Sequence, residues 1–385
     1  MFSLSDYSFI LPPERIADSA ITPQHNARLI TIAKEWGEIL SEDIFWNLDA
    51  YIPPERVLFF NNSKVLRARV PLREKEIQKE DGAMSLLKEW EIFFIKKIDE
   101  ERFEAMVRPG KKLRKWTQFQ IGKYTLKIEE NTQYGRILRI SGGEIFSFLE
   151  EHGELPLPPY IEYSKEKEKW YETVFGEKHG SVAAPTASLH FTEELLKKIE
   201  NPKEYVTLHV WLGTFKWIDT SDIREYKIHE ESVEIDILLF EKIMKYKKGG
   251  KKVIAVWTTV CRTLESLPYV WKELTEQERA YTSHEVQNYW DEIIEWEEMQ
   301  NWTHQVHINT SSKTLTFSTS IYITPWYTYK IVDELITNFH LPESSLLVLV
   351  ASIIGQKRLL EIYRYAIEKA YRFYSFWDGM YIRSK

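Results

Sequence analysis

VLFFNNSKVLRARV, residues 57–70, changes its pattern halfway and stands where two parts of the chain meet. Its first half is a continuous apolar run that ends at Asn61-Asn62, and its second half alternates so that Arg67 and Arg69 fall on one face. An unbroken apolar run is typical of a buried strand, whereas alternation with period two is typical of a half-buried strand. The stretch therefore predicts a strand, a loop and a second strand of a different kind.

The segment that follows, residues 71–150, holds short β-rich runs separated by turn residues and shows no long helical pattern. Such spacing favours a small all-β fold. We therefore expect residues 71–150 to form a small domain inserted into a larger one, which comprises residues 1–70 plus 151–385. The β-rich runs are EIFFIKKI (91–98), RFEAMVRPG (102–110), YTLKIEE (124–130) and GRILRI (135–140).

The second half of the chain has the pattern of a mixed α/β domain. FTEELLKKIE (191–200) carries the signals of a capped helix, with Thr192 ahead of two glutamates and two lysines near the end. YVTLHV (205–210) and KKVIAVWTTV (251–260) are apolar, β-branched runs of the kind found in buried parallel strands. SSLLVLVASIIG (344–355) is shorter than the roughly 20 residues of a membrane span and predicts a buried helix.

Length and composition predict a folded protein with two domains. The 385 residues exceed the roughly 250 to 300 at which single cores stop growing. A hydrophobic fraction of 43% with 28% charged residues is typical of folded, soluble chains. The N-terminus lacks the features of a signal peptide, and the lone Cys261 cannot form an internal disulfide, so we expect a cytoplasmic protein.

The net charge of -7 argues against a protein coated in basic residues, yet binding to phosphates depends on local clusters. The densest basic stretches are RPGKKLRK (108–115) and KYKKGGKK (245–252). For a single run of this kind, a solvated surface is the more frequent role. The acidic counterpart at residues 271–306 has helical spacing, and we expect it to be a surface insertion in the larger domain.

The sequence holds no familiar cofactor or metal signature, so candidate residues come from strand ends and loops. GxGxxG after a strand, GxxxxGKS, CxxC and HExxH are all absent. His209 closes a predicted buried strand, at the edge where α/β folds place their ligands, with a hydrogen-bonded core histidine as the alternative. His229 precedes two glutamates that can orient it for proton transfer, with an exposed ion pair as the alternative.

Taken together, the motifs resemble one family, the S-adenosylmethionine:tRNA ribosyltransferase-isomerases, in that family's order and over nearly the whole chain. A collinear series of this length is far more specific than any single motif. The segments that carry the resemblance are DYSFILPPERIA (6–17), LFFNNSKVLRARV (58–70), VRPGKKL (107–113), HGELPLPPYI (152–161), SVAAPTASLHF (181–191), YVTLHVWLGTF (205–215), IHEESVEI (228–235), VIAVWTTVCRTLES (253–266), YITPWYTYKIVDELITNFHLPESSLLVLVASIIG (322–355) and YRFYSFWDGMYI (371–382).

The resemblance implies an enzyme of queuosine biosynthesis, both transferase and isomerase. Such an enzyme moves the ribosyl part of S-adenosylmethionine onto 7-aminomethyl-7-deazaguanine at the wobble position of tRNAs with GUN anticodons. The product is epoxyqueuosine, and adenine and methionine leave. The fold implied is a large mixed α/β domain, of the α+β class, carrying a small β-barrel. The resemblance further implies S-adenosylmethionine as substrate and no other cofactor. From the residues we also expect no metal and no membrane association, and we expect a monomer or weak homodimer.

The residues in matching motifs supply the candidate site. We expect titratable groups to move protons during ribose opening, and polar groups to hold the two substrates. The catalytic candidates are His209, His229, Glu231, His340 and Asp378, of which the three histidines are expected to titrate near neutrality. The substrate-binding candidates are Asn61, Asn62, Arg67, Arg69, Arg108, Lys111, Lys112, Thr186, His190, Thr214, Thr258, Thr259, Arg262 and Asn338. Of these, the arginines and lysines among residues 67–112, together with Arg114, are expected to contact tRNA phosphates.

Five departures from the family share a pattern, because each puts tryptophan where the family normally has glycine. The chain holds 14 tryptophans but only 15 glycines, and glycine usually makes up roughly 7% of a protein. Both observations follow if the gene comes from an organism in which UGA codes for glycine and was read here with UGA as tryptophan. A smaller departure is Ser188, also at a usual glycine. The five positions are Trp116, Trp211, Trp257, Trp326 and Trp377.

Two alternatives to the enzyme remain open from the sequence. If the five tryptophans are genuine, the chain is a degenerate, non-catalytic relative that binds RNA. A methyltransferase is the other alternative, although such an enzyme usually shows a glycine-rich loop after its first strand, and this sequence has none.

Overall fold

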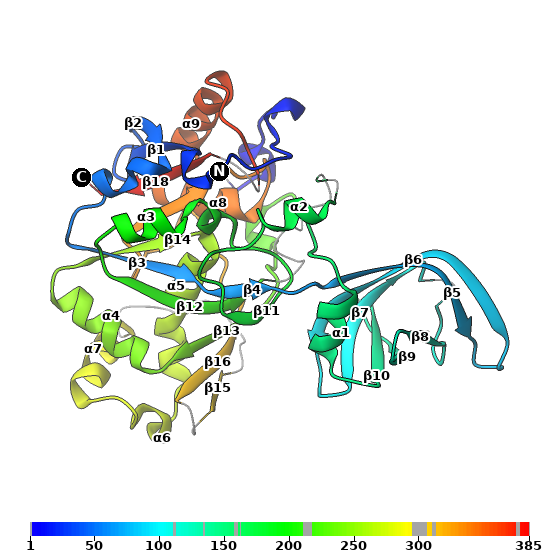
Figure 1. Cartoon of the computed structure of the whole chain (residues 1–385). Coiled ribbons are helices and arrows are strands. Elements are labelled where there is room, and N and C mark those ends of the chain that lie inside the picture. The colour runs from blue at the N-terminus through cyan, green and yellow to red at the C-terminus, as the bar shows by residue number, and fades with distance from the viewer. Residues whose placement is uncertain are drawn as a thin grey trace. The chain divides into compact units, whose positions relative to one another are not determined.

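The computed structural model describes residues 2–110, 113–133, 135–157, 161, 163–210, 218–294, 306–309, 313–374 and 378–384. The chain divides into two compact units, which are described separately below (Figure 1). The larger unit comprises Met1–Ser63, Pro159–Lys178 and Pro185–Lys385, and the smaller comprises Lys64–Pro158 and His179–Ala184.

A ten-stranded mixed sheet forms the larger unit, in the order β15-β16-β13-β12-β3-β14-β17-β18-β1-β2. Its centre is parallel, because β12, β3, β14 and β17 all run the same way. Antiparallel strands flank this centre, with β13 beside β12 and β18 beside β17. The strands are β1 (Arg28–Ala33), β2 (Ile39–Ile44), β3 (Arg56–Asn61), β12 (Lys203–His209), β13 (Glu231–Asp236), β14 (Lys252–Val256), β15 (Val306–Asn309), β16 (Thr314–Thr319), β17 (Glu334–Asn338) and β18 (Gly379–Arg383).

The helices of this unit pack on the two faces of the sheet. Thr192 caps α3 as expected, its side chain accepting a hydrogen bond from the Leu195 backbone. The apolar run 344–355 forms the buried helix α8. The α-helices are α2 (Lys165–Glu168), α3 (Glu193–Lys198), α4 (Leu238–Lys248), α5 (Thr258–Glu273), α6 (Glu276–Arg279), α7 (His284–Ile294), α8 (Ser345–Ile354) and α9 (Gln356–Glu368). Short 3-10 turns are η1 (Leu4–Tyr7), η2 (Pro13–Arg15), η3 (Gln24–Asn26), η4 (Phe45–Tyr51), η5 (Thr186–His190) and η7 (Ile223–Glu225).

Alternation along the central strands divides the core between the two faces. Leu58 and Phe60 of β3 join a buried cluster with Leu195 of α3 and Phe45 of η4. The intervening residues of β3 point to the opposite face. That face is the one on which α5 packs, in contact with β3, β12 and β14. Because the parallel strands are covered on both sides, they read as unbroken apolar runs in the sequence.

The smaller unit is a closed six-stranded barrel in the order β10-β7-β6-β5-β8-β9, with β10 pairing back to β9 (Figure 1). Its interior is apolar, with Val70, Ile92, Phe94 and Leu126 among the fully or almost fully buried side chains. The elements are β5 (Arg69–Gln78), β6 (Met84–Lys97), β7 (Arg102–Arg108), β8 (Gln118–Ile121), β9 (Tyr124–Asn131), β10 (Arg136–Ser141) and the helix α1 (Ile145–His152). The expected fold class, a mixed α/β fold with a small barrel, is therefore confirmed.

The structure corrects several details of the expected elements. The stretch 57–70 contains two strands before the barrel rather than one. An additional short strand, β4 (Ser63–Val65), begins immediately after Asn62. That strand pairs with β11 (Lys178–Ser181). Only the first part of the run 251–260 forms a strand, because α5 begins at Thr258. The run 205–210 is parallel to β3 on one side and antiparallel to β13 on the other.

The acidic stretch contributes α6 and α7 within its described part, and residues 295–305 lie outside that part. Throughout the described ranges, no helix is both long and apolar enough to cross a membrane.

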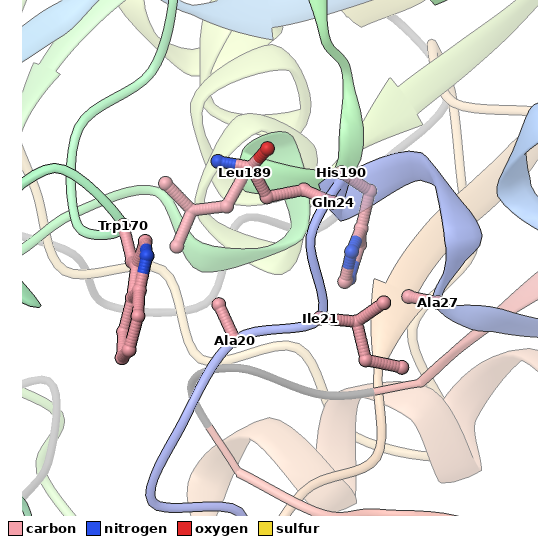
Figure 2. Close-up of a pocket in the computed structure, with 7 residues that line it drawn as sticks. All are labelled: Ala20, Ile21, Gln24, Ala27, Trp170, Leu189 and His190. Atoms are coloured by element: carbon pink, nitrogen blue, oxygen red, sulfur yellow. The ribbon is translucent and has the colours of Figure 1, made fainter.

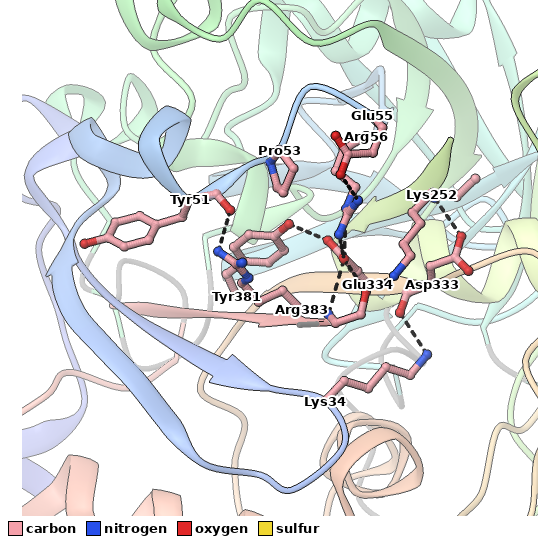
Figure 3. Close-up of polar contacts among 12 residues, drawn as sticks. Lys34, Tyr51, Pro53, Glu55, Arg56, Lys252, Asp333, Glu334, Tyr381 and Arg383 are labelled. Atoms are coloured by element: carbon pink, nitrogen blue, oxygen red, sulfur yellow. Dashed lines mark hydrogen bonds and ion pairs between the residues drawn. The ribbon is translucent and has the colours of Figure 1, made fainter. Parts of the chain in front are cut away.

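At the amino ends of the parallel strands, here called the amino edge, a buried carboxylate is fully paired (Figure 3). Glu334, which begins β17, accepts hydrogen bonds from Arg56 Nε at 2.9 Å, from the Tyr381 hydroxyl, and from Ser384 Oγ at 2.6 Å. Arg56 also pairs with the exposed Glu55 at 3.0 Å. Every charge of this group thus has a partner inside the fold.

Candidate active site at the carboxyl edge of the sheet

The opposite edge, where the parallel strands end, gathers many of the predicted residues; we call it the carboxyl edge. Asn61, His209 and Asn338 are the last residues of β3, β12 and β17. The antiparallel neighbours begin there, since His209 pairs with Ser232 and Asn338 with Gly379. Glu231 and Asp378, each adjacent to one of these pairs, therefore lie at the same edge. Open α/β sheets bind their ligands at this edge.

A buried ion pair occupies one part of the carboxyl edge. Arg262 Nη1 donates to Glu231 Oε2 at 2.5 Å, and both side chains are almost completely buried. Arg262 Nε donates to the backbone oxygen of Ile321 at 3.0 Å, which fixes the guanidinium plane. His229 Nε2 lies 3.5 Å from Glu231 Oε1. The predicted pairing of His229 with a following carboxylate is therefore present, and its partner is Glu231 rather than Glu230.

Helix α5, which carries Arg262, begins at Thr258. Trp257 precedes the helix and provides no side-chain cap. Thr258 and Thr259 are the first helical residues and are buried. Among the described residues, neither Thr258 Oγ1 nor Arg262 Nη2 has a hydrogen-bond partner. Buried polar atoms are usually paired, so two unpaired ones on one helix mark this place as unusual.

Asn61 and Asn62 tie strands together rather than pointing into an open site. The Asn61 amide donates to the backbone oxygen of Leu208 at 2.9 Å and accepts from Ser63 N at 3.0 Å. Asn62 Oδ1 accepts from the Thr207 hydroxyl at 2.7 Å. These bonds join β3 to β12 at the point where both strands end.

His209 ends β12 as expected and is largely buried. Burial lowers its pKa, with Glu234 opposing that shift and Lys178 adding to it. Its Nδ1 has no partner in the part of the chain that the structure describes. A neutral imidazole with one open nitrogen suits a proton acceptor.

A second polar group lies around the end of β17. Asn338 Nδ2 and His190 Nε2 are 3.0 Å apart, and the Thr186 hydroxyl donates to Asn338 Oδ1 at 3.3 Å. Phe45 stacks on the His190 ring with centroids 4.2 Å apart. Burial, and secondarily the charge of Arg372, lowers the pKa of His190 to about 3. The three predicted residues thus meet, around a histidine that stays neutral.

A small pocket opens next to His190. In Figure 2, Trp170 and His190 stand on opposite sides of it, with Ala20 and Ile21 between them. Gln24, Ala27 and Leu189 complete the lining. Gln24 and Trp170 are not among the predicted site residues, because neither falls at a predicted strand end or in a catalytic motif.

His340 and Asp378 are held by the fold itself. His340 Nε2 is 2.9 Å from the Thr337 hydroxyl, and its backbone N–H donates to Tyr363 at 2.9 Å. Burial lowers the His340 pKa to about 3, so the expectation that it titrates near neutrality is wrong. Asp378 accepts from the backbone N–H groups of Arg28 and Arg372, both at 2.8 Å, and burial raises its pKa.

The basic candidates Arg67, Arg69 and Arg108 belong to the barrel unit. Arg67 and Arg69 are half-buried and alternate with buried Ala68 and Val70, as expected. Arg69 pairs with Glu91 at 3.0 Å, and Arg108, 73% exposed, lies 3.6 Å from the same carboxylate. Lys111, Lys112 and Thr214 lie outside the described residues.

The backbone at two of the five tryptophans has the conformation that favours glycine. Trp257 has φ 90° and ψ 148°, and Trp116 has φ 69°. Positive φ is strained for a residue with a side chain, and the region of Trp257 is almost exclusive to glycine. Trp326 is half-exposed and stacks on Phe2. Trp211 and Trp377 lie outside the described residues.

Comparison with known proteins matches this chain over almost its full length. The profile of the family described as "Queuosine biosynthesis protein" matches residues 4–382. A S-adenosylmethionine:tRNA ribosyltransferase-isomerase of Thermosynechococcus vestitus is 34% identical, over 99% of this chain and 96% of the relative. Enzymes of the same name from Halothermothrix orenii and Clostridioides difficile are 36% and 35% identical, each over 98% of this chain and 99% of its own.

A crystal structure of a S-adenosylmethionine tRNA ribosyltransferase from Thermotoga maritima also matches, with 27% identity and a TM-score of 0.49. It covers 98% of this chain and 100% of its own. Because the family profile and relatives above 30% identity both extend along nearly the whole sequence, the chain belongs to the queuosine biosynthesis protein family.

Proposed function

We propose that this chain is a S-adenosylmethionine:tRNA ribosyltransferase-isomerase whose reaction takes place at the carboxyl edge of its ten-stranded sheet. It transfers the ribosyl moiety of S-adenosylmethionine to 7-aminomethyl-7-deazaguanine at the wobble position of tRNAs with GUN anticodons, forms epoxyqueuosine and releases adenine and methionine. The observation that carries the proposal is the full-length match to enzymes of that name. The polar groups gathered at the carboxyl edge support it.

The reaction needs a base and an acid at close quarters. The sulfonium of the donor acidifies the neighbouring C5′ hydrogens, so removal of one of them starts ribose opening with loss of adenine. The aminomethyl nitrogen of the acceptor has to be neutral to attack, and adenine leaves more readily when it is protonated. A single edge that holds several titratable side chains meets these demands.

Within this site, we assign proton transfer to His229 and His209. The Glu231 carboxylate orients His229, because it is itself held by Arg262 and lies 3.5 Å from the imidazole. His209 is kept neutral by burial and has an unpaired Nδ1 among the described residues, which suits it to accept a proton. His190 and His340 stay neutral through burial and act in positioning.

The barrel unit supplies the contacts to tRNA phosphates. Arg108 is 73% exposed, and Lys115 and Lys127 lie 4.9 and 4.7 Å from the centroid of the half-exposed Trp116 ring. The other basic stretch, at residues 245–252, is a weaker candidate, because Lys245, Lys247 and Lys248 are each paired with an acidic residue. Phosphate contacts of this kind make affinity fall with salt.

The test is release of adenine and methionine from S-adenosylmethionine, dependent on tRNA that carries the deazaguanine precursor. We expect His229→Ala to lower kcat by about 100- to 10,000-fold, the usual contribution of a general acid or base. His284→Ala is the matched control, since His284 is an exposed histidine of the same unit. The assay is run on the printed sequence and on the form with glycine at the five tryptophan positions.

Adenine release without tRNA, or methylation of tRNA instead, would contradict the proposal. Full turnover by His229→Ala would remove only that residue from the mechanism. For the barrel, charge reversal at Arg108 and Lys127 is expected to weaken tRNA binding and flatten its salt dependence. An unchanged salt slope would place the tRNA elsewhere.

A further inference from the structure

The start of α5, from Thr258 to Arg262, carries two buried polar atoms that have no hydrogen-bond partner in the described fold. They are Thr258 Oγ1 and Arg262 Nη2, on residues that are 0% and 2% exposed. Residues four apart lie on one face of a helix, and helical side chains tilt toward its N-terminus. Arg262 therefore reaches back over the turn that Thr258 begins.

The Arg262 guanidinium is fixed in place, so its open nitrogen has a defined direction. Nε is bound to the Ile321 backbone oxygen and Nη1 to Glu231. The first backbone N–H groups of a helix have no partner within the helix, and the helix dipole adds positive potential there. Trp257 caps none of them with its side chain. A hydroxyl and a guanidinium nitrogen that lack an acceptor in the described fold thus belong to the start of a helix, where the backbone amides add positive potential.

We propose that this group binds the α-carboxylate of the methionyl part of S-adenosylmethionine; the inference rests on the proposed function. A carboxylate accepts hydrogen bonds from guanidinium, hydroxyl and backbone amide donors, and helix N-termini bind such anions. Arg262 is already paired with Glu231, so the pair as a whole is neutral. A neutral pair with both signs of charge fits the zwitterionic amino-acid end of the donor better than it fits a tRNA phosphate. Full burial also favours a small ligand over a polynucleotide backbone.

The site explains why glycine is expected at position 257. The backbone there has φ 90°, at the residue that leads into the donor group. Glycine is used where the backbone takes such a conformation and where a ligand approaches it closely. Both reasons apply at this turn.

The test compares S-adenosylmethionine with its decarboxylated form as donor. For the unaltered chain, we expect kcat/KM for the decarboxylated donor to be about 10- to 100-fold lower, the usual range for charge-assisted hydrogen bonds. Thr258→Val keeps the shape of the side chain and removes the hydroxyl. It is expected to raise KM for S-adenosylmethionine several-fold and to leave KM for the decarboxylated donor unchanged.

Thr263→Val is the matched control. Thr263 is also buried in α5, but its hydroxyl donates to the Thr259 backbone oxygen at 3.0 Å, so its loss should affect both donors alike. Equal use of the two donors by the unaltered chain would overturn the carboxylate site, as would an equal loss for both donors in Thr258→Val. If neither donor is consumed, the proposed function fails. Calorimetric titration with each donor then decides the carboxylate site by itself, since equal affinities would overturn it.

Discussion

Two buried charged groups at opposite edges of the central sheet, Glu334 and Arg262, differ in how completely they are paired. At the amino edge, the Glu334 carboxylate accepts hydrogen bonds from Arg56, Tyr381 and Ser384. At the carboxyl edge, Arg262 and Thr258 keep an unpaired polar atom among the described residues. Unsatisfied buried groups cost roughly 1–3 kcal/mol each, so the open atoms of Arg262 and Thr258 cost stability that the fully paired Glu334 carboxylate does not.

The two groups therefore have different roles within one sheet. A buried carboxylate with all its hydrogen bonds made contributes to stability and needs no ligand. An edge with open donors and neutral histidines is poised for a substrate that completes its hydrogen bonds.

The largest effect is expected from Glu334→Ala at the amino edge. The substitution leaves the Arg56 charge buried without its main partner, which usually costs about 3–5 kcal/mol. The free energy of unfolding from urea denaturation measures this loss. Glu55→Ala is the matched control, because it removes the exposed partner of the same arginine, and exposed pairs contribute only about 0–1 kcal/mol. Equal losses in the two variants would contradict the contrast between the edges.

A smaller effect is expected from acid, through His190 and His340 at the carboxyl edge. Both have a folded pKa of about 3, below the ordinary value of 6.5, because burial disfavours the charged form. Between these values the unfolded chain binds more protons than the folded one, so stability is present above pH 6.5 and is lost as pH falls toward 3. At pH 5 each histidine should cost about 2 kcal/mol.

Urea denaturation at pH 7 and pH 5 measures this loss. His340→Gln should reduce the loss at pH 5 by the contribution of one histidine, about 2 kcal/mol, because glutamine does not titrate. Unfolding free energies that fall equally in the variant and the parent would show that other groups set the slope.

The smallest effect is expected from Trp257→Gly, when it is compared with Trp290→Gly as a matched control. Both indoles are buried, so each substitution leaves a cavity that costs stability. Only at position 257 does glycine also release a side chain from φ 90°, which should spare about 1–3 kcal/mol of the free energy of unfolding. The Trp290→Gly variant loses, in addition, the hydrogen bond that the indole N–H donates to the Phe240 backbone oxygen at 3.0 Å. Equal losses in the two variants, or a UGG codon at position 257, would contradict the recoding hypothesis.

Local patterns made several parts of the fold predictable. The apolar runs that became β3, β12, β14 and α8 are long enough to be recognised, and Thr192 caps α3 through a contact three residues away. The end of KKVIAVWTTV was predicted less well, because β-branched Thr258, Thr259 and Val260 favour strand locally while packing on the sheet makes them helix.

The candidate site was predictable as a set of residues and not as an arrangement. Glu231 was expected near His229 because the two are close in sequence. Its bond to Arg262, 31 residues away, follows only from the register of β13 against β12 and the position of α5. The neutral state of His340 could not be predicted either, because burial is a property of the folded surroundings.

By itself, the sequence determined which stretches form strands and helices, which family the motifs resemble and where tryptophan replaces an expected glycine. These properties depend on short-range periodicity and residue identity, which the chain carries locally. Only the tertiary structure decided which polar groups are paired and which stay open. Pairing depends on atoms that strand order and helix packing bring together from distant parts of the chain, as for Arg56 with Glu334 and Arg262 with Glu231.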